Sequence, residues 1–211
     1  MSEIGLHLSV RSLTDADLPS HGWAGSPKQV GEPVHQIRRA EGGEVAHLAV
    51  CTSAGLPVAV CGIDGTVEPS AGTLWQLGGR PALRSCGIGT LLVRSAERRI
   101  GIRGLTRTEL GVEESNPHAR ALDERLGRPA FGRELESWDM EAEDSPLRRH
   151  ETMCTPLRKD LTQHWISPPS SPGRRPTGTA SGPAALDGCR SMVLLDPATV
   201  RLLHALAGTY F

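Results

Sequence analysis

Residues 80–90 read R-P-A-L-R-S-C-G-I-G-T, and this stretch decides the fold. It follows a segment typical of a strand, Thr73 to Leu77, and precedes a segment with helical periodicity. Arg84, Gly87 and Gly89 have the spacing of a loop whose backbone N–H groups converge on an anion at a helix N-terminus. A side chain at either glycine would stand between those groups and the anion, and a Cβ disfavours the positive φ angles of many such turns. The stretch predicts a strand, a pyrophosphate-binding loop and a helix, although a Gly-x-Gly pair also occurs in ordinary turns.

The segments after the loop favour the anion-binding interpretation. Helical periodicity continues to Gly101, while Arg94, Glu97 and Arg98 lie off the apolar stripe, on a face that we expect to be solvated. Residues 105–112 then alternate as a strand. The apolar stripe of the helix consists of Ile88, Leu92, Ala96 and Ile100.

A second helix is predicted from its start signals. Asn116 has the position of an N-cap, and Pro117 follows at the first helical residue. Gly127 closes the helix. Its apolar seam is formed by Ala119, Leu122 and Leu126.

These two motifs resemble those of the GNAT superfamily of N-acetyltransferases. The cofactor motif of that family is arginine or glutamine, two residues, glycine, any residue, and glycine or alanine, and the residues from Arg84 to Gly89 satisfy it. The segment from Glu113 to Gly127 is similar to a second signature, in which an asparagine precedes a helix that ends in leucine-glycine. The resemblance extends more weakly from about Leu6 to about Leu161.

The resemblance implies an α/β fold: a mixed, mostly antiparallel central sheet, splayed at an acetyl-CoA site, with helices on both faces. It implies acetyl-CoA as the acyl donor substrate and no metal. The residues that it implies for cofactor binding lie at the end of the first strand, in the loop and before the second helix. They are Leu77, Gly79, Arg84, Ser85, Cys86, Gly87, Ile88, Gly89, Thr90 and Asn116.

Asp123 departs from the family pattern. Members commonly have a tyrosine there, whose phenol is thought to protonate the departing thiolate, and the one tyrosine of this chain is Tyr210. An ordinary aspartate has a pKa near 3.9 and is ionised at neutral pH. The polar neighbours Arg120, Glu124 and Arg125 predict partial solvation of Asp123. We therefore expect slow acetyl transfer, with Asp123 as a candidate catalytic residue.

A general base is also needed, because an amine is mostly protonated at neutral pH. Glu113 is the candidate, since it lies at the end of the strand where related enzymes sometimes carry a catalytic carboxylate. Glu109 and Glu114 are alternatives, and Gly111 occupies another place where a carboxylate would be expected. Glutamates at strand ends are more often simply solvated.

Composition and net charge limit the expected binding partners and cellular location. The chain has 211 residues and a formal net charge of −1, without a concentrated basic patch, so neither nucleic acid nor a membrane is expected as a partner. Its five cysteines form no paired or zinc-binding spacing, which favours reduced thiols and a cytoplasmic location. The expected acceptor is a small-molecule or peptide amine, and the oligomeric state stays open, with a homodimer as one alternative.

Residues 1–163 are expected to form the acetyltransferase domain, with further strands at its start, in the middle and near its end. The expected strands include alternating residues 6–10, a hairpin of 45–51 and 58–63, and closing strands 134–140 and 151–157 linked by charged residues 141–150. Residues 14–17 predict a capped helix start, and residues 34–40 one or two helical turns. Residues 164–211 are expected to be a disordered linker and tail of unknown role.

Two functions remain open at this stage. The first is transfer of an acetyl group from acetyl-CoA to a primary amine by direct attack. The alternative is a CoA-binding module with weak or lost catalysis, which acts as a regulatory or interaction protein.

Overall fold

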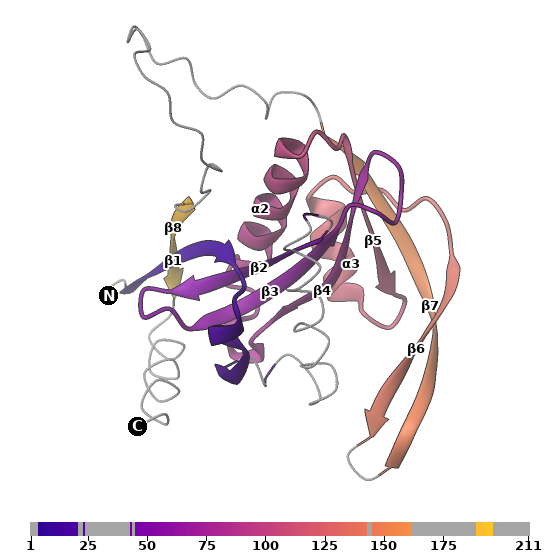
Figure 1. The fold of residues 1–211 in the computed structure, drawn as a ribbon, viewed down its shortest axis with the longest axis horizontal. Coiled ribbons are helices and arrows are strands. Elements are labelled where there is room, and N and C mark those ends of the chain that lie inside the picture. The colour runs from indigo at the N-terminus through magenta and orange to yellow at the C-terminus, as the bar shows by residue number, and fades with distance from the viewer. Residues whose placement is uncertain are drawn as a thin grey trace, which may run out of the picture.

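The computed structural model describes residues 4–20, 23, 43, 45–142, 145–161 and 189–195. The described strands form one sheet in the order β6-β7-β5-β4-β3-β2-β1-β8 (Figure 1). The elements are β1 Ile4–Ser12, η1 Asp15–Ser20, β2 Val45–Thr52, β3 Pro57–Asp64, β4 Ala71–Gly79, η3 Pro81–Leu83, α2 Ile88–Ile102, β5 Arg107–Glu113, α3 Pro117–Arg125, β6 Glu134–Ala142, β7 Ser145–Asp160 and β8 Cys189–Leu195.

The sheet is mixed and mostly antiparallel, as the resemblance implied. β4 and β5 are parallel, while the other paired strands that the structure describes are antiparallel. Helix α2 connects β4 to β5, because parallel neighbours need a crossover connection.

The main core lies between the sheet and α2. The predicted apolar stripe of this helix is buried, and so are Thr108, Leu110 and Val112 of β5. The helical periodicity of α2 and the strand alternation of β5 are both confirmed. A second, smaller cluster on the opposite face joins β2 and β3 to the segment around η1. Its members are Leu13, Ala49, Cys51 and Val60, with Trp23 packed against them.

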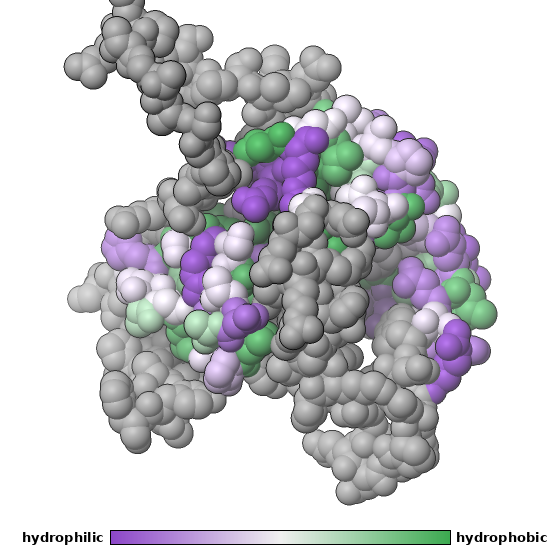
Figure 2. All heavy atoms as spheres, in the orientation of Figure 1, coloured by the Kyte–Doolittle hydropathy of each residue, from purple (hydrophilic) through white to green (hydrophobic). Residues whose placement is uncertain are grey.

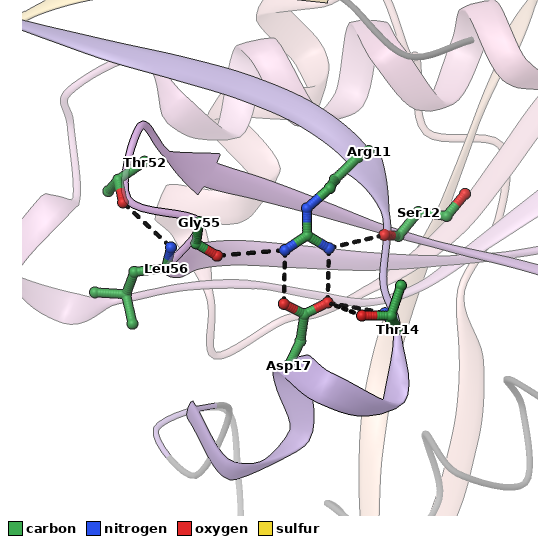
Figure 3. Close-up of polar contacts among 7 residues, drawn as sticks. All are labelled: Arg11, Ser12, Thr14, Asp17, Thr52, Gly55 and Leu56. Carbon is green, nitrogen blue, oxygen red and sulfur yellow. Dashed lines mark hydrogen bonds and ion pairs between the residues drawn. The ribbon is translucent and has the colours of Figure 1, made fainter. Parts of the chain in front are cut away.

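An ion pair holds the corner between β1 and η1 against the hairpin of β2 and β3 (Figure 3). The two guanidinium nitrogens of Arg11 donate to the two carboxylate oxygens of Asp17, each at 2.6 Å. Arg11 also donates to the Gly55 carbonyl in the hairpin turn at 3.3 Å, and Asp17 accepts from the Thr14 backbone N–H at 2.9 Å. The pKa of Asp17 falls to about 2, mainly because Arg11 hydrogen-bonds its charged form.

Two expectations about local structure need correction. The residues after Thr14 form a 3-10 helix, which contains Pro19. The charged segment 141–150 does not form a long loop, because β7 already begins at Ser145 and pairs there with Ala142. This long β6–β7 hairpin extends from the body of the molecule in Figure 1, and Figure 2 shows hydrophilic residues along its edge with isolated hydrophobic ones between them.

The structure describes one segment of the tail. Residues 189–195 form β8, which pairs antiparallel with β1 from Ile4↔Leu195 to Val10↔Cys189. The alternating residues of β1 thus lie inside the sheet and not at its edge. The expected helical turns over 34–40 and the remainder of the tail lie outside the described residues.

Candidate functional site

The predicted anion loop connects β4 to α2 through the short helix η3. The first backbone hydrogen bond of α2 runs from the Leu91 N–H to the Gly87 carbonyl at 3.1 Å. The N–H groups of residues 88–90 therefore remain outside the helical hydrogen bonding, as at every helix start. Arg84, Ser85 and Gly87 are exposed, so an anion can reach this end of the helix.

The two glycines of the loop serve different geometric needs. Gly87 is the N-cap and has a φ of 81°, a left-handed conformation that glycine adopts without a Cβ penalty. Gly89 is already helical, so the expectation of a positive φ does not apply to it. Its constraint is packing, because a Cβ there would lie 3.0 Å from Leu122 Cδ2 of α3. Ser85 is not a glycine but also has a positive φ, of 63°. This backbone conformation bends the chain before the helix.

Next to the loop, the sheet is open between β4 and β5. The two strands pair from Ala71↔Arg107 to Thr73↔Glu109 and then separate, as Figure 1 shows. Beyond Thr73, no strand among the described residues pairs with this side of β4. Leu77 and Gly79, two of the predicted cofactor residues, lie on this separated end. An extended ligand could therefore hydrogen-bond to the β4 backbone here.

A bulge redirects β4 at the point of separation. The register with β3 shifts between Gly62↔Trp75 and Val60↔Gly78, so β4 carries one residue more than its partner. Gln76 lies inside this bulge with a φ of 47°. The bulge re-aims the backbone of β4 where the loop follows, a position at which such irregularities often serve a site.

Asn116 caps α3, as predicted. Its side-chain oxygen accepts from the Ala119 backbone N–H at 3.1 Å, and Pro117 is the first helical residue. The side chain is thus committed to satisfying a backbone donor of the helix start. Its predicted contact with a cofactor stays a prediction.

Asp123 is buried, with 1% of its surface exposed, which contradicts its expected solvation. Its Oδ1 accepts from Arg128 Nη1 at 3.1 Å. Arg128 is itself 0% exposed, and its Nη2 donates to Glu97 Oε1 at 2.6 Å. Burial raises the pKa of Asp123, while the positive charge of Arg128 opposes that rise.

The charges around Arg128 form a closed network that joins α2, α3, β5 and β7. Glu97 was expected on a solvated face but is 3% exposed, and Lys159 Nζ donates to its Oε1 at 2.9 Å. Thr108 of β5 accepts from Arg128 Nε at 3.1 Å. Two carboxylates thus face two cations, and this balance makes the burial of these charges tolerable.

The opposite face of β5 carries the remaining candidate carboxylates. Glu109, Gly111 and Glu113 alternate with the buried residues of this strand, so they point away from α2. Glu109 Oε1 is 2.7 Å from Arg107 Nε. Glu113 Oε2 accepts from Ser115 Oγ at 3.2 Å and lies 3.8 Å from His150 Nε2.

Sequence reasoning missed a further carboxylate on this face. If Gly111 carried a Cβ, that atom would lie 2.4 Å from Glu136 Oε1, so the Glu136 side chain of β6 occupies the space left by the glycine. Only the pairing of β6 to β7 and of β7 to β5 brings this residue to position 111. The absent side chain at Gly111 was the one available signal in the sequence.

Cys51, Cys61, Cys86 and Cys154 are free thiols, and all of them but Cys86 are buried. Burial raises the pKa of Cys51 to about 11 and that of Cys61 to about 12. Cys86, in the loop, is half-buried, and its Sγ lies 3.5 Å from the Arg84 carbonyl oxygen. Within the described ranges, no group of three or more histidine, cysteine, aspartate or glutamate residues could hold a metal ion.

The splayed mixed sheet and the loop lined with N–H groups define an acetyltransferase-type α/β fold. A family model described as the Acetyltransferase (GNAT) family matches residues 11–127, more than half of the chain, and the chain belongs to this family. No curated protein sequence matches the chain. Among the helices that the structure describes, none is long and apolar enough to cross a membrane.

Solved structures share the fold at low sequence identity. The ribosomal-protein-S18-alanine N-acetyltransferase of Escherichia coli is 18% identical with a TM-score of 0.55, over 74% of this chain and 94% of that one. Spermidine N-acetyltransferase of Vibrio cholerae, solved with CoA and spermine, is 15% identical with a TM-score of 0.57, over 76% and 98%. An N-acetyltransferase of Staphylococcus aureus is 13% identical with a TM-score of 0.58, over 74% and 99%. These similarities establish the fold.

Proposed function

We propose that this chain transfers an acetyl group from acetyl-CoA to the primary amine of a small molecule or a peptide by direct attack. The observation that carries the proposal is the loop of residues 84–90, which is exposed at Arg84, Ser85 and Gly87 and has helix-start N–H groups outside the helical hydrogen bonding, beside the separated strands β4 and β5. An anion-binding helix start and an open strand edge are the two features that a pyrophosphate on an extended arm requires.

The residues present fit acetyl-CoA at this place. The N–H groups of residues 85–90 and the exposed Arg84 would hold the diphosphate, because they combine oriented donors with a positive charge. The backbone from Leu77 to Gly79 would hold the arm that leads to the thioester. Bound there, acetyl-CoA supplies an activated acetyl group, while the chain orients it and the acceptor.

Amine acceptors fit the family and the relatives with known acceptors. One relative is named for an alanine of ribosomal protein S18 and another for spermidine, so both peptide and small-molecule amines are candidates. We place the reaction in the cytoplasm, in keeping with the free thiols of Cys51, Cys61, Cys86 and Cys154.

The alternative, a CoA-binding module with weak catalysis, is favoured by one observation. Asp123, at the position where the family commonly has a tyrosine, is buried and paired with Arg128. A carboxylate that accepts from a buried guanidinium is poorly suited to protonate a leaving thiolate. Acetyl transfer then depends on water for that proton, which a thiol pKa of about 8.5 permits.

A titration with acetyl-CoA separates the two functions. Free thiol is followed over a panel of spermidine, an aminoglycoside and a peptide with N-terminal alanine, together with calorimetric binding of acetyl-CoA. The proposal expects binding and amine-dependent thiol release with at least one acceptor. Binding without release across the panel would favour the module, and no binding would reject both functions.

A further inference from the structure

We propose that Glu136 is the general base that removes the proton from the acceptor amine, a role that rests on the proposed acetyl transfer. The central observation is that its carboxylate fills the space beside Gly111, where a side chain of β5 would otherwise stand. The β6–β7 hairpin thus supplies a carboxylate to a β5 position that has none of its own.

Strand register places this carboxylate at the opening of the sheet. The last pair between β4 and β5 is Thr73↔Glu109, and Gly111 follows two residues later, where the strands have separated. Leu110 and Val112 point into the core against α2, so Gly111 and Glu136 lie on the opposite face. An acetyl group that lies between β4 and β5 can therefore be approached from this face by an amine held at Glu136.

The other carboxylates that β5 carries on this face are already engaged. Glu109 is paired with Arg107 at 2.7 Å, and Glu113 accepts from Ser115 and lies near His150. The structure records no ion pair of Glu136 with any described residue. Among the described carboxylates of β5 and Glu136, the Glu136 carboxylate is thus the one left to accept a hydrogen bond from an ammonium group.

Cys154 supports the placement of Glu136. This buried thiol of β7 has its pKa raised to about 11, first by burial and then by the charges of Glu136 and Glu113. At neutral pH the thiol is therefore protonated and can donate to Glu136, leaving the remaining lone pairs of the carboxylate for a substrate. Glu136 itself is half-buried, so an acceptor can reach it while bulk water is partly excluded.

The proton balance of the step is simple. Glu136 takes one proton from the ammonium form of the acceptor, and the amine nitrogen then forms a bond to the thioester carbonyl carbon as the carbon–sulfur bond breaks. The second proton lost from nitrogen goes to the departing thiolate, directly or through water. Glu136 returns its proton to solvent, so the products are an amide, CoA thiol and one proton.

The test compares Glu136→Gln with the unaltered chain and with a control, Glu151→Gln. Glu151 is an exposed residue of the same hairpin, where its backbone lies opposite Ser137. Acetyl transfer to spermidine and to a peptide with N-terminal alanine is measured between pH 6 and pH 10. We expect kcat of Glu136→Gln at neutral pH to fall about 100-fold or more. The deficit should shrink at high pH, where the amine is already deprotonated. Glu151→Gln should keep its activity.

Gly111→Ala provides a second variant that removes no carboxylate. The new Cβ would displace the flexible end of Glu136, so kcat should fall by about 10- to 100-fold while the fold is retained. Two readouts do not depend on turnover: acetyl-CoA binding by calorimetry should be unchanged in each variant, and the pKa of Cys154, followed by NMR of labelled cysteine, should fall in Glu136→Gln.

The outcomes separate the two claims. Normal turnover of Glu136→Gln, or loss of acetyl-CoA binding by this variant, would overturn the role of Glu136 and leave acetyl transfer intact. Absence of thiol release by the unaltered chain with every acceptor would overturn both. Three results together would establish Glu136 as the base: a large loss in kcat at neutral pH, retained acetyl-CoA binding, and a smaller loss in kcat at high pH.

Discussion

At the residue scale, the buried guanidinium of Arg128 is the most consequential polar group that the structure reveals. It bonds Asp123, Glu97 and Thr108, which belong to three different elements. The charged partners would be costly to bury alone, so their positions depend on one another. This dependence changes how Asp123 is understood, from a residue near solvent to a member of an internal charge network.

Replacing Arg128 should therefore destabilise the fold. Arg128→Met leaves the Asp123 and Glu97 carboxylates facing Lys159 alone, and we expect a loss of about 3–5 kcal/mol in the free energy of unfolding. Glu124→Ala is the matched control, because it breaks the exposed ion pair with Arg120 and should cost less than about 1 kcal/mol. Urea unfolding monitored by circular dichroism measures both values, and similar small losses would show that the network contributes little.

The sequence could not reveal this network. Asp123 and Arg128 are five residues apart across a helix end, so they do not match the helical spacing that predicts side-chain pairs. Glu97 lies off the apolar stripe of α2, which ordinarily indicates solvent, yet β7 and the segment after α3 cover it with Lys159 and Arg128. Only the tertiary packing of these elements places the four charges together.

At the element scale, the contact between Arg11 and Asp17 fixes the start of the fold. It joins β1, η1 and the turn between β2 and β3, and it is only partly accessible to solvent, with 31% of the Arg11 side chain and 6% of the Asp17 side chain exposed. A partly shielded, doubly hydrogen-bonded pair stabilises more than a freely solvated one.

This pair should give stability a specific dependence on pH. The pKa of Asp17 is about 2 in the folded chain and 3.8 in the unfolded reference, so its stabilisation is present above about pH 4 and is lost as pH falls toward 2. The full contribution is about 2 kcal/mol. Denaturant unfolding at several pH values should show the stability gap between the unaltered chain and Asp17→Asn closing between about pH 5 and pH 2. A gap that stays constant over this range would contradict the assignment.

Most regular elements follow from local sequence patterns, and the exceptions have local causes. The helical stripe of α2, the cap of α3 and the hairpin of β2 and β3 are confirmed because each is specified by residues close in sequence. The 3-10 geometry of η1 was not foreseen, although Pro19 disfavours a continued α-helix there. The early start of β7 was missed because charged residues 141–150 resemble a loop when their pairing partner is unknown.

At the scale of the whole molecule, β1 is an interior strand because β8 covers it. The two pair along seven residues that are separated by most of the chain, and no local pattern predicts such a contact. The anion loop, in contrast, could be predicted, because its glycines and the helix start are adjacent in sequence. Glu136 could not, since it reaches Gly111 only through two strand pairings.

Hydrogen exchange tests the position of β1. In an interior strand successive backbone N–H groups are all bonded to a neighbour, so the amides of residues 8–10, where β1 pairs with both β2 and β8, should all be protected. If β1 were at the edge, every second amide would exchange rapidly. Amide exchange of the full chain followed by NMR distinguishes the two patterns residue by residue.

The central claim is that backbone donors at the start of α2 bind the diphosphate of acetyl-CoA, and a pair of glycine substitutions tests it most directly. Gly87 and Gly104 have φ angles of 81° and 80°, and in each case a Cβ would meet nothing within 4 Å, so alanine imposes similar backbone strain at both positions. Only Gly87 lies in the loop.

Calorimetric titration of acetyl-CoA into Gly87→Ala, Gly104→Ala and the unaltered chain is the measurement. We predict that Gly87→Ala weakens binding about tenfold or more, because strain there displaces N–H groups that grip the ligand, whereas Gly104→Ala binds normally. Equal affinities for all three proteins would contradict the account.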